Sequence, residues 1–305
     1  MNKESFRRQL RILRRKKWPV ALAVILVISI IAAPIALTLR SNYKRFSAKN
    51  PIPLSKYIIR DSEREKIHLI AHRGYSSQAP ENTVPAVQAA GKYRFDTVEF
   101  DVRQTQDGVW VVSHDADVKP MTDKKGKISS YTYYDLVTCT VDNGANHKDY
   151  ENLKIPTLDR MLKACLECNV RPMIEIKDYT EDGIKTLLET VEKNGFTESC
   201  SIISFDREAL ELVRKQNPDI KLYALVQKLD KKEMAKCLEN KDIGVSFNGH
   251  KKTNDEKKIK KLMDAGIPLA CWTVDDKETV EKYFAMGVTE FVTNTIYQGK
   301  KQNAS

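Results

Sequence analysis

After residue 60 the sequence has no excess of positive charge, although the chain of 305 residues carries a formal charge of +10. Residues 1–60 contain 14 Lys and Arg and one acid, Glu4, whereas residues 61–305 contain 37 bases and 40 acids. The basic character therefore belongs to the amino-terminal segment alone. This distribution argues against a strongly basic nucleic-acid-binding domain, and no nucleic-acid partner is expected.

Residues 18–39 lack a charged residue over 22 consecutive positions. A helix of that length, at about 1.5 Å per residue, spans the ~30 Å hydrocarbon core of a bilayer. A buried core helix is the weaker alternative, because soluble helices rarely need an apolar surface on every side. A cleaved signal peptide normally has a shorter apolar region. The sequence therefore predicts an uncleaved transmembrane helix that anchors the chain in a membrane.

The flanks of this run predict its orientation. Eight bases precede residue 18, and six more are spread over residues 40–60. The positive-inside bias favours a basic cytoplasmic tail over residues 1–17 and a single-pass protein of the cell membrane. Residues 40–64 are predicted to be a linker, and residues 65–305 an extracytoplasmic globular domain.

The six cysteines lack the spacing of a zinc site. Cys165 and Cys168 form one C-x-x-C, but no second such pair or pair of histidines accompanies it. Both lie in a stretch with helical periodicity, three positions apart on one face. Buried structural thiols are the favoured interpretation, although an extracytoplasmic domain can pair some cysteines as disulfides.

The rest of the chain shows no internal repeat, and short β-branched runs alternate with amphipathic stretches. Strands are predicted at 67–71, 97–103, 109–113, 171–177, 200–205, 221–226, 243–247, 268–274 and 290–294. Helices are predicted at 83–93, 157–168, 181–195, 206–217, 231–240, 254–266 and 276–287. This alternation and length predict an α/β fold, a TIM (β/α)₈ barrel. The ninth strand is explained by a hairpin of 97–103 with 109–113, and residues 116–154 are predicted to be an insertion over one barrel face.

Acidic and basic side chains gather near predicted strand ends, where barrel active sites form. His72 and Arg73 follow the first strand, and Arg73 is expected to be free to bind a phosphate. Glu99 and Asp101, two apart on a strand, share one face. Two acids facing a barrel interior imply a divalent cation between them, with oxygen ligands favouring Mg²⁺ or Ca²⁺. A solvated strand face is the alternative.

Two further strand ends add candidates. His114 ends the returning hairpin strand, so it is expected roughly across from Asp101 and able to exchange protons near neutral pH. Glu175 and Lys177 share a face at the end of the 171–177 strand. Glu175 is a candidate third metal ligand and Lys177 a candidate phosphate partner, with an ordinary interstrand ion pair as the alternative.

Three segments, HRGYSSQAPENT, VEFDVRQTQDGVWVVSHD and MIEIK, closely resemble the glycerophosphodiester phosphodiesterase family in this order. The resemblance covers roughly residues 67–300. It implies a TIM barrel and metal-dependent hydrolysis of glycerophosphodiesters to glycerol 3-phosphate and an alcohol.

The resemblance also implies roles for individual residues. His72 and His114 match the general acid/base pair, Glu99, Asp101 and Glu175 match the metal ligands, and Arg73 and Lys177 match the phosphate-neutralising cations. Trp272 is expected to line the glycerol or alcohol pocket, which the 116–154 insertion can also shape. One departure is Asn294, where many members have Asp, and it leaves the role of that position open. Alternative functions are a phosphodiesterase acting on lysophospholipids or envelope glycerol-phosphate polymers, and a non-catalytic, membrane-tethered binding module.

Overall fold

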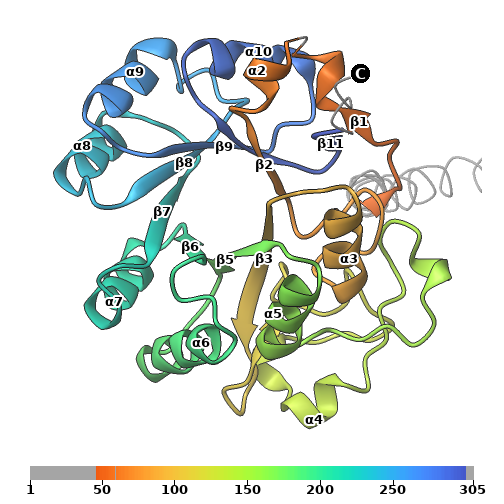
Figure 1. The fold of residues 1–305 in the computed structure, drawn as a ribbon. Coiled ribbons are helices and arrows are strands. Elements are labelled where there is room, and N and C mark those ends of the chain that lie inside the picture. Colours follow the sequence, from red (N-terminus) through yellow and green to blue (C-terminus); the bar gives the residue numbers. More distant parts are fainter. Residues whose placement is uncertain (1–45, 59, 300–305) are drawn as a thin grey trace, which may run out of the picture. The chain divides into compact units, whose positions relative to one another are not determined.

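Eight parallel strands close into a barrel, as the sequence predicts. The structure is a computed structural model, and it describes residues 46–58 and 60–299. The sheet order is β2-β10-β9-β8-β7-β6-β5-β3, and pairing of β2 with β3 closes the ring (Figure 1). The strands are β2 (His68–Ala71), β3 (Thr97–Gln104), β5 (Arg171–Ile176), β6 (Ser201–Ser204), β7 (Lys221–Val226), β8 (Gly244–Asn248), β9 (Leu269–Trp272) and β10 (Glu290–Thr293).

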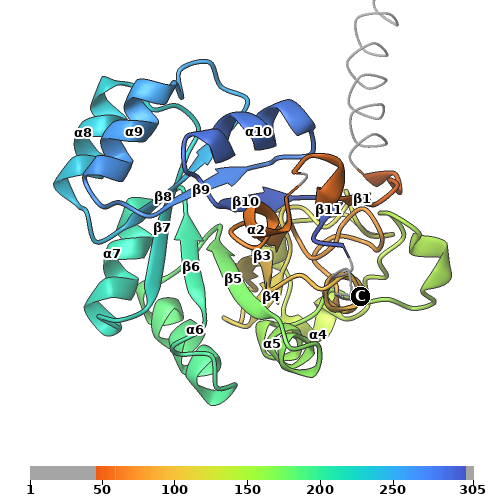
Figure 2. The same cartoon turned by 45° about the horizontal axis from the view of Figure 1, so that its top comes forward.

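Helices surround the strand ring (Figure 2), and seven of those in the described residues have nine or more residues. They are α3 (Val84–Lys92), α5 (Leu158–Glu167), α6 (Glu181–Lys193), α7 (Arg207–Gln216), α8 (Lys231–Glu239), α9 (Glu256–Asp264) and α10 (Lys277–Ala285). Six of them begin at a Thr or Asp whose side chain accepts a hydrogen bond from the first turn. All nine predicted strands and all seven predicted helices are present, with small shifts at their ends.

The strand that exceeds the eight of the barrel is β4 (Trp110–Val112). It is antiparallel to β3, as the predicted hairpin requires. It pairs with the carboxyl half of β3, with Val102 opposite Val112 and Gln104 opposite Trp110. Because β5 already occupies the other edge of β3, β4 lies on the edge that β2 uses lower down. This arrangement returns the chain to the carboxyl end of the barrel immediately before His114.

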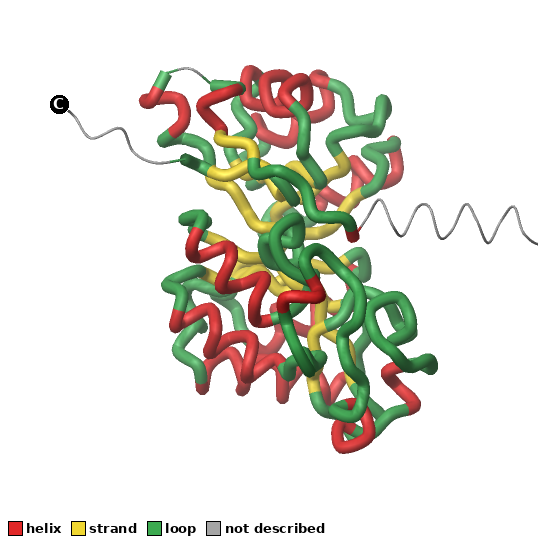
Figure 3. The backbone as a smooth tube through the Cα atoms, turned by 90° about the vertical axis from the view of Figure 1, so that its right-hand side faces the viewer, coloured by secondary structure: helices red, strands yellow, loops and turns green. Residues whose placement is uncertain are grey.

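The insertion at 116–154 has a small core of its own. Figure 3, seen from the side that carries this region, shows it mostly as loop. Its short elements are η2 (Ile128–Ser130), α4 (Tyr133–Leu136) and η3 (His147–Asp149). The buried cluster beneath them comprises Val111, Val118, Ile128, Leu136, Cys139, Val141 and Ile155. The insertion is therefore folded around buried side chains. The sequence has no long periodic pattern there from which this packing could be predicted.

The linker prediction does not hold for the described part of residues 40–64. Strand β1 (Ile52–Pro53) pairs with β11 (Ile296–Tyr297), followed by η1 (Leu54–Lys56) and α2 (Asp61–Arg64). This segment lies between α10 and α3 (Figure 1). Among the described residues no helix follows β10, so the apolar side chains of Leu54 and Ile58 cover that side of the barrel. Residues 46–64 are thus part of the barrel unit.

Two further predictions concern the transmembrane helix and the cysteines. The predicted transmembrane run at 18–39 lies outside the described residues, and within 46–58 and 60–299 no helix has the length and apolar character to cross a membrane. All six cysteines are free thiols; Cys168 is partly exposed and the other five are buried. The burial of Cys165 agrees with the structural interpretation, whereas Cys168 is only partly buried.

The packing of the amino-terminal segment predicts a stability effect. Leu54 is completely buried, so Leu54→Ala is expected to cost about 2–5 kcal/mol in the free energy of unfolding. Urea denaturation measures the loss. Lys56→Ala, at an exposed position in the same short helix, is the matched control and should change little. Equal midpoints for the two variants would contradict the packing role of this segment.

Candidate active site

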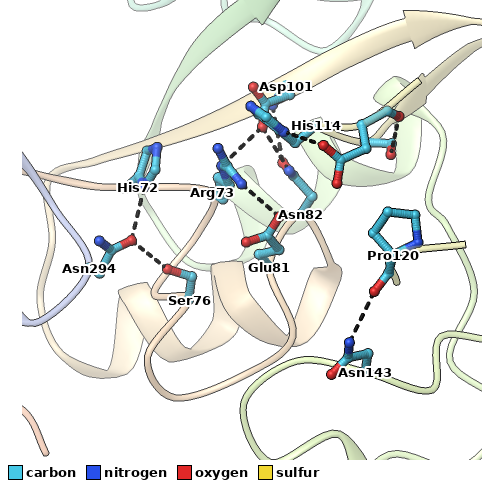
Figure 4. A network of polar contacts seen from close by, with 12 residues as sticks. His72, Arg73, Ser76, Glu81, Asn82, Asp101, His114, Pro120, Asn143 and Asn294 are labelled. Atoms are coloured by element: carbon cyan, nitrogen blue, oxygen red, sulfur yellow. Dashed lines mark hydrogen bonds and ion pairs between the residues drawn. The ribbon is translucent and has the colours of Figure 1, made fainter. Parts of the chain in front are cut away.

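One cavity at the carboxyl end of the barrel collects seven of the eight side chains predicted from the sequence. It has a volume of about 170 Å³, and its lining includes His72, Arg73, Glu99, His114, Glu175, Lys177 and Trp272. The eighth residue, Asp101, is fully buried and forms an ion pair with Arg73 and with Lys177. Figure 4 shows His72, Arg73, Asp101 and His114 near one another; His72 and Arg73 follow β2, Asp101 lies within β3 and His114 follows β4.

Three carboxylates form the base of the site. Glu99 and Asp101 alternate with buried apolar residues along β3, and the register of β3 with β5 sets Asp101 beside Glu175. One oxygen from each carboxylate lies within 4.8 Å of the others. Their exposed fractions are 2%, 0% and 8% for Glu99, Asp101 and Glu175. The alternative of a solvated strand face is therefore wrong.

The electrostatics of these carboxylates suit a bound cation. Burial, with Asp101 and Glu175 nearby, raises the pKa of Glu99 well above its ordinary value. Burial and the charge of Asp101 raise the pKa of Glu175 to about 7. For Asp101 the effect of burial is outweighed by Arg73 and Lys177, which hold its pKa below the usual range.

Two oxygens of this cluster are available as ligands. Glu99 Oε1 and Asp101 Oδ1 are buried and receive no hydrogen bond within the described part of the chain. Carboxylate oxygens this close together, two of them without a hydrogen bond, fit a hard divalent ion. Glu99, Asp101 and Glu175 are therefore the residues that could hold a divalent ion.

Arg73 is held in place by acids rather than left free. Its Nη1 donates to Glu81 Oε1 at 2.8 Å, and its Nε lies 3.5 Å from Asp101 Oδ2. Its backbone N–H donates to Glu99 Oε2 at 2.8 Å. The turn needs Gly74, because φ is +75° and a Cβ there would meet Ala86 at 2.4 Å. The expectation of a free Arg73 is thus corrected, although its side chain still lines the cavity.

Asn82 is a site residue that the sequence does not reveal. Thr83, not Asn82, is the residue that directly precedes α3. Asn82 instead donates from Nδ2 to Asp101 Oδ2 at 2.8 Å and accepts from the Asp101 backbone N–H at 3.1 Å. It thereby orients the central carboxylate. Its positive φ of 60°, which Asn tolerates better than most residues, accompanies this role.

The two histidines reach the cavity from two different strands. His72 follows β2, and its Nδ1 lies 2.9 Å from Asn294 Oδ1 at the end of β10. Burial, followed by the charge of Arg73, lowers the pKa of His72 to about 4, so the ring is neutral near pH 7. His114 follows β4, and its Nδ1 lies 2.9 Å from Asp115 Oδ1. Arg103 fixes the loop by donating from Nε and Nη2 to the His114 carbonyl.

Lys177 combines the two roles considered for it. Its Nζ lies 2.7 Å from Glu175 Oε1 and 3.3 Å from Asp101 Oδ1. It also lines the cavity, where an ammonium can meet an anionic substrate. The interstrand ion pair therefore exists and leaves Lys177 at the site.

Two aromatic side chains, Trp272 and Phe205, form another part of the cavity wall. Trp272 ends β9, donates from Nε1 to the Ser246 carbonyl at 2.9 Å, and meets Phe205 edge-on with ring centroids 5.7 Å apart. Phe205 is 49% exposed and is also part of an open neighbouring groove of about 530 Å³. Sequence reasoning missed Phe205. No residue of the 116–154 insertion lines the cavity or this groove, so the expected contribution of the insertion to the pocket is not found.

A family model and several known proteins match the residues that form this barrel. The glycerophosphoryl diester phosphodiesterase family model matches residues 72–297. Glycerophosphodiester phosphodiesterase 1 of Homo sapiens is 30% identical over 174 residues, covering 56% of this chain and 52% of the human protein. The chain thus spans about half the length of the mammalian relatives it matches. The glycerophosphodiester phosphodiesterase of Caldanaerobacter subterraneus is 29% identical over 239 residues, covering 75% and 94% of the two chains.

Solved structures share the barrel. A glycerophosphodiester phosphodiesterase from Parabacteroides distasonis matches with a TM-score of 0.62 and 26% identity, covering 74% of this chain and 92% of that chain. An Oleispira antarctica phosphodiesterase in complex with the product sn-glycerol-3-phosphate matches with a TM-score of 0.69 and 23% identity, covering 76% and 95%. At that identity the second likeness concerns the fold.

The raised carboxylate pKa values predict pH-dependent metal binding. Glu175 titrates at about 7 and Glu99 above its usual range, so a cation must displace protons from them at low pH. The apparent affinity for Mg²⁺ is therefore expected to fall, by up to about tenfold per pH unit for each proton displaced, as the pH drops below about 7. Calorimetric titration in buffers of different ionisation enthalpy measures both the affinity and the proton release. Affinity that stays constant between about pH 8 and pH 6 would contradict this electrostatic description.

Proposed function

The chain belongs to the glycerophosphoryl diester phosphodiesterase family, and on this premise we propose that it hydrolyses glycerophosphodiesters to glycerol 3-phosphate and an alcohol with the aid of a divalent metal ion. One observation carries the proposal. Three buried acids, two histidines and two cationic side chains surround one cavity at the barrel mouth. This set provides proton transfer, charge neutralisation and a metal site at one point.

The histidines carry the proton transfers in this proposal. The 2-hydroxyl of the glycerol moiety attacks phosphorus and gives its proton to one imidazole, while the other protonates the departing alcohol oxygen. Water then opens the cyclic phosphate, and both proton movements reverse, so each imidazole ends as it began. His72 is neutral near pH 7 because of its lowered pKa, which suits it to accept the first proton. His114 then serves as the acid.

Charge on the phosphate is met by the remaining residues. Glu99, Asp101 and Glu175 would hold the divalent ion, which when bound polarises a phosphoryl oxygen as a Lewis acid. Arg73 and Lys177 add positive charge along the same wall of the cavity. Because the ligand set contains only carboxylate oxygens, we propose Mg²⁺ or Ca²⁺ as the ion.

The alcohol end of the substrate is assigned to the aromatic side of the cavity. Trp272 and Phe205 form this wall, and the groove beyond Phe205 has room for a head group. Lysophospholipids and envelope glycerol-phosphate polymers are the alternative substrates that the same chemistry can serve. A non-catalytic binding module is disfavoured because every predicted catalytic and metal-binding side chain is present and gathered together.

We also propose a location for this activity. The charge-free run at 18–39 and the basic residues before it support a single-pass protein of the cell membrane, with a cytoplasmic amino terminus and the barrel outside. An alkaline-phosphatase fusion at the carboxyl terminus is expected to be active. An active fusion to a cytoplasm-specific reporter would reverse this orientation.

Release of glycerol 3-phosphate from glycerophosphocholine by the purified full-length chain tests the proposed reaction. The product is expected with Mg²⁺ or Ca²⁺ present and should disappear when EDTA is added, because the three acids hold the ion. An enzyme-coupled assay for glycerol 3-phosphate gives the readout. Absence of release from glycerophosphocholine, from lysophospholipids and from glycerol-phosphate polymers by folded, metal-binding protein would overturn the catalytic assignment.

Variants separate the proton-transfer groups from the metal ligands. His72→Ala and His114→Ala are each expected to lower kcat by about 10²–10⁴-fold, while calorimetric titration still shows metal binding. Glu99→Gln is expected to lose both activity and metal affinity, because it removes a charged ligand from the cluster. Wild-type turnover in either His variant would end the acid/base assignment.

A further inference from the structure

Asn294 makes a chain of polar contacts that ends on a catalytic histidine (Figure 4). Its Oδ1 lies 2.9 Å from His72 Nδ1 and accepts from Ser76 Oγ at 3.0 Å. Its Nδ2 donates to Asp275 Oδ2 at 2.8 Å. The two ends of one amide therefore face two different neighbours, and each contact restricts the other.

Asp275 determines which way the amide points. Its Oδ1 accepts hydrogen bonds from the hydroxyls of Thr293 and Thr295 and from the backbone N–H groups of Asn294 and Thr295. Lys49 Nζ lies 3.6 Å from its Oδ2. Although burial opposes the charge, these donors hold the pKa of Asp275 below its ordinary value. An ionised carboxylate only accepts hydrogen bonds, so the amide nitrogen of Asn294 must face it.

The orientation of the amide then determines the protonation of His72. A flipped amide would place Oδ1 against the Asp275 carboxylate, where two acceptors would face each other and the 2.8 Å hydrogen bond would be lost. With Oδ1 toward His72, the neutral ring must carry its proton on Nδ1 to make the 2.9 Å contact. The other ring nitrogen, Nε2, is then left with a free lone pair.

We propose that Asn294, oriented by Asp275, is a positioning residue that holds neutral His72 in the Nδ1–H tautomer, so that Nε2 accepts the proton from the attacking hydroxyl. The proposal deepens the proposed function and rests on it only for the role of His72 as the base. The negative charge lies on Asp275, and the neutral amide of Asn294 stands between it and the ring of His72.

The tautomer is measured directly, without any substrate. Nitrogen-15 NMR of the imidazole side chains in the full-length protein reports which ring nitrogen is protonated, and the signal of His72 is assigned by its loss in His72→Gln. Protonated Nδ1 and unprotonated Nε2 are expected near neutral pH. Protonated Nε2 in the wild-type chain would overturn the proposal, whether or not the protein is a diesterase.

Variants test the transmission through Asn294. Asn294→Ala is expected to lower kcat about 10–100-fold with KM nearly unchanged, and to leave His72 as a mixture of tautomers. Asn240→Ala, at the carboxyl end of α8, is the control and should keep wild-type kinetics. Wild-type kcat together with an unaltered Nδ1–H tautomer in Asn294→Ala would refute the positioning role.

A reciprocal exchange gives the sharpest comparison. Asn294→Asp alone sets a second carboxylate at hydrogen-bonding distance from Asp275, so activity near neutral pH should fall. The double variant Asp275→Asn, Asn294→Asp restores one donor and one acceptor at that contact and still presents an oxygen to His72. We expect the double variant to exceed Asn294→Asp in kcat and to retain the Nδ1–H tautomer. A double variant no better than the single one would contradict the assigned hydrogen-bond directions.

A lack of diesterase activity in the wild-type chain would be a failure of the proposed function alone. In that case the wild-type tautomer and its response to Asn294→Ala still decide the positioning role. The two proposals can therefore fail separately.

Discussion

Three carboxylates buried within 4.8 Å of one another are the constraint on which the rest of the site depends. Placing like charges in a low-dielectric interior is costly unless cations and hydrogen bonds compensate for them. Arg73 and Lys177 supply positive charge, and Asn82 donates to Asp101. Two carboxylate oxygens still lack a hydrogen bond among the described residues. A divalent cation is the remaining element that accounts for this arrangement.

The barrel turns short sequence motifs into this cluster. Parallel strands present their carboxyl ends at one rim, so residues that follow β2, β4, β5, β9 and β10 meet although they are far apart in the chain. The antiparallel β4 is the one exception to strand direction, and it brings His114 back to that rim beside β3. The site is thus assembled from strand ends, while the outer helices and residues 46–64 provide the packed support.

Much of this arrangement could be predicted from the sequence, because it depends on local periodicity. Alternation along β3 identifies Glu99 and Asp101 as neighbours on one face, and the positions of His72 and Glu175 at strand ends follow from the same reading. Helices are found where amphipathic stretches follow capping residues. The register between β3 and β5, which sets Asp101 opposite Glu175, adds a detail that periodicity alone does not specify.

Residues whose roles depend on distant partners could not be predicted. Asn82 looks like a helix cap until β3 places Asp101 beside it, and Asn294 looks like a departure from the family until His72 and Asp275 are seen on its two sides. Similarly, the Pro-containing stretch from Pro51 resembles a tether in sequence. Its pairing with β11 depends on residues 296–297, which are more than 240 positions away in the sequence.

The most direct test of the central claim is the location of a bound ion. Anomalous diffraction from crystals of the protein soaked with Mn²⁺, as a substitute for Mg²⁺, would locate it. The account predicts an anomalous peak about 2.0–2.6 Å from oxygens of Glu99, Asp101 and Glu175. Crystals that take up Mn²⁺ elsewhere while these three carboxylates remain without it would contradict the account.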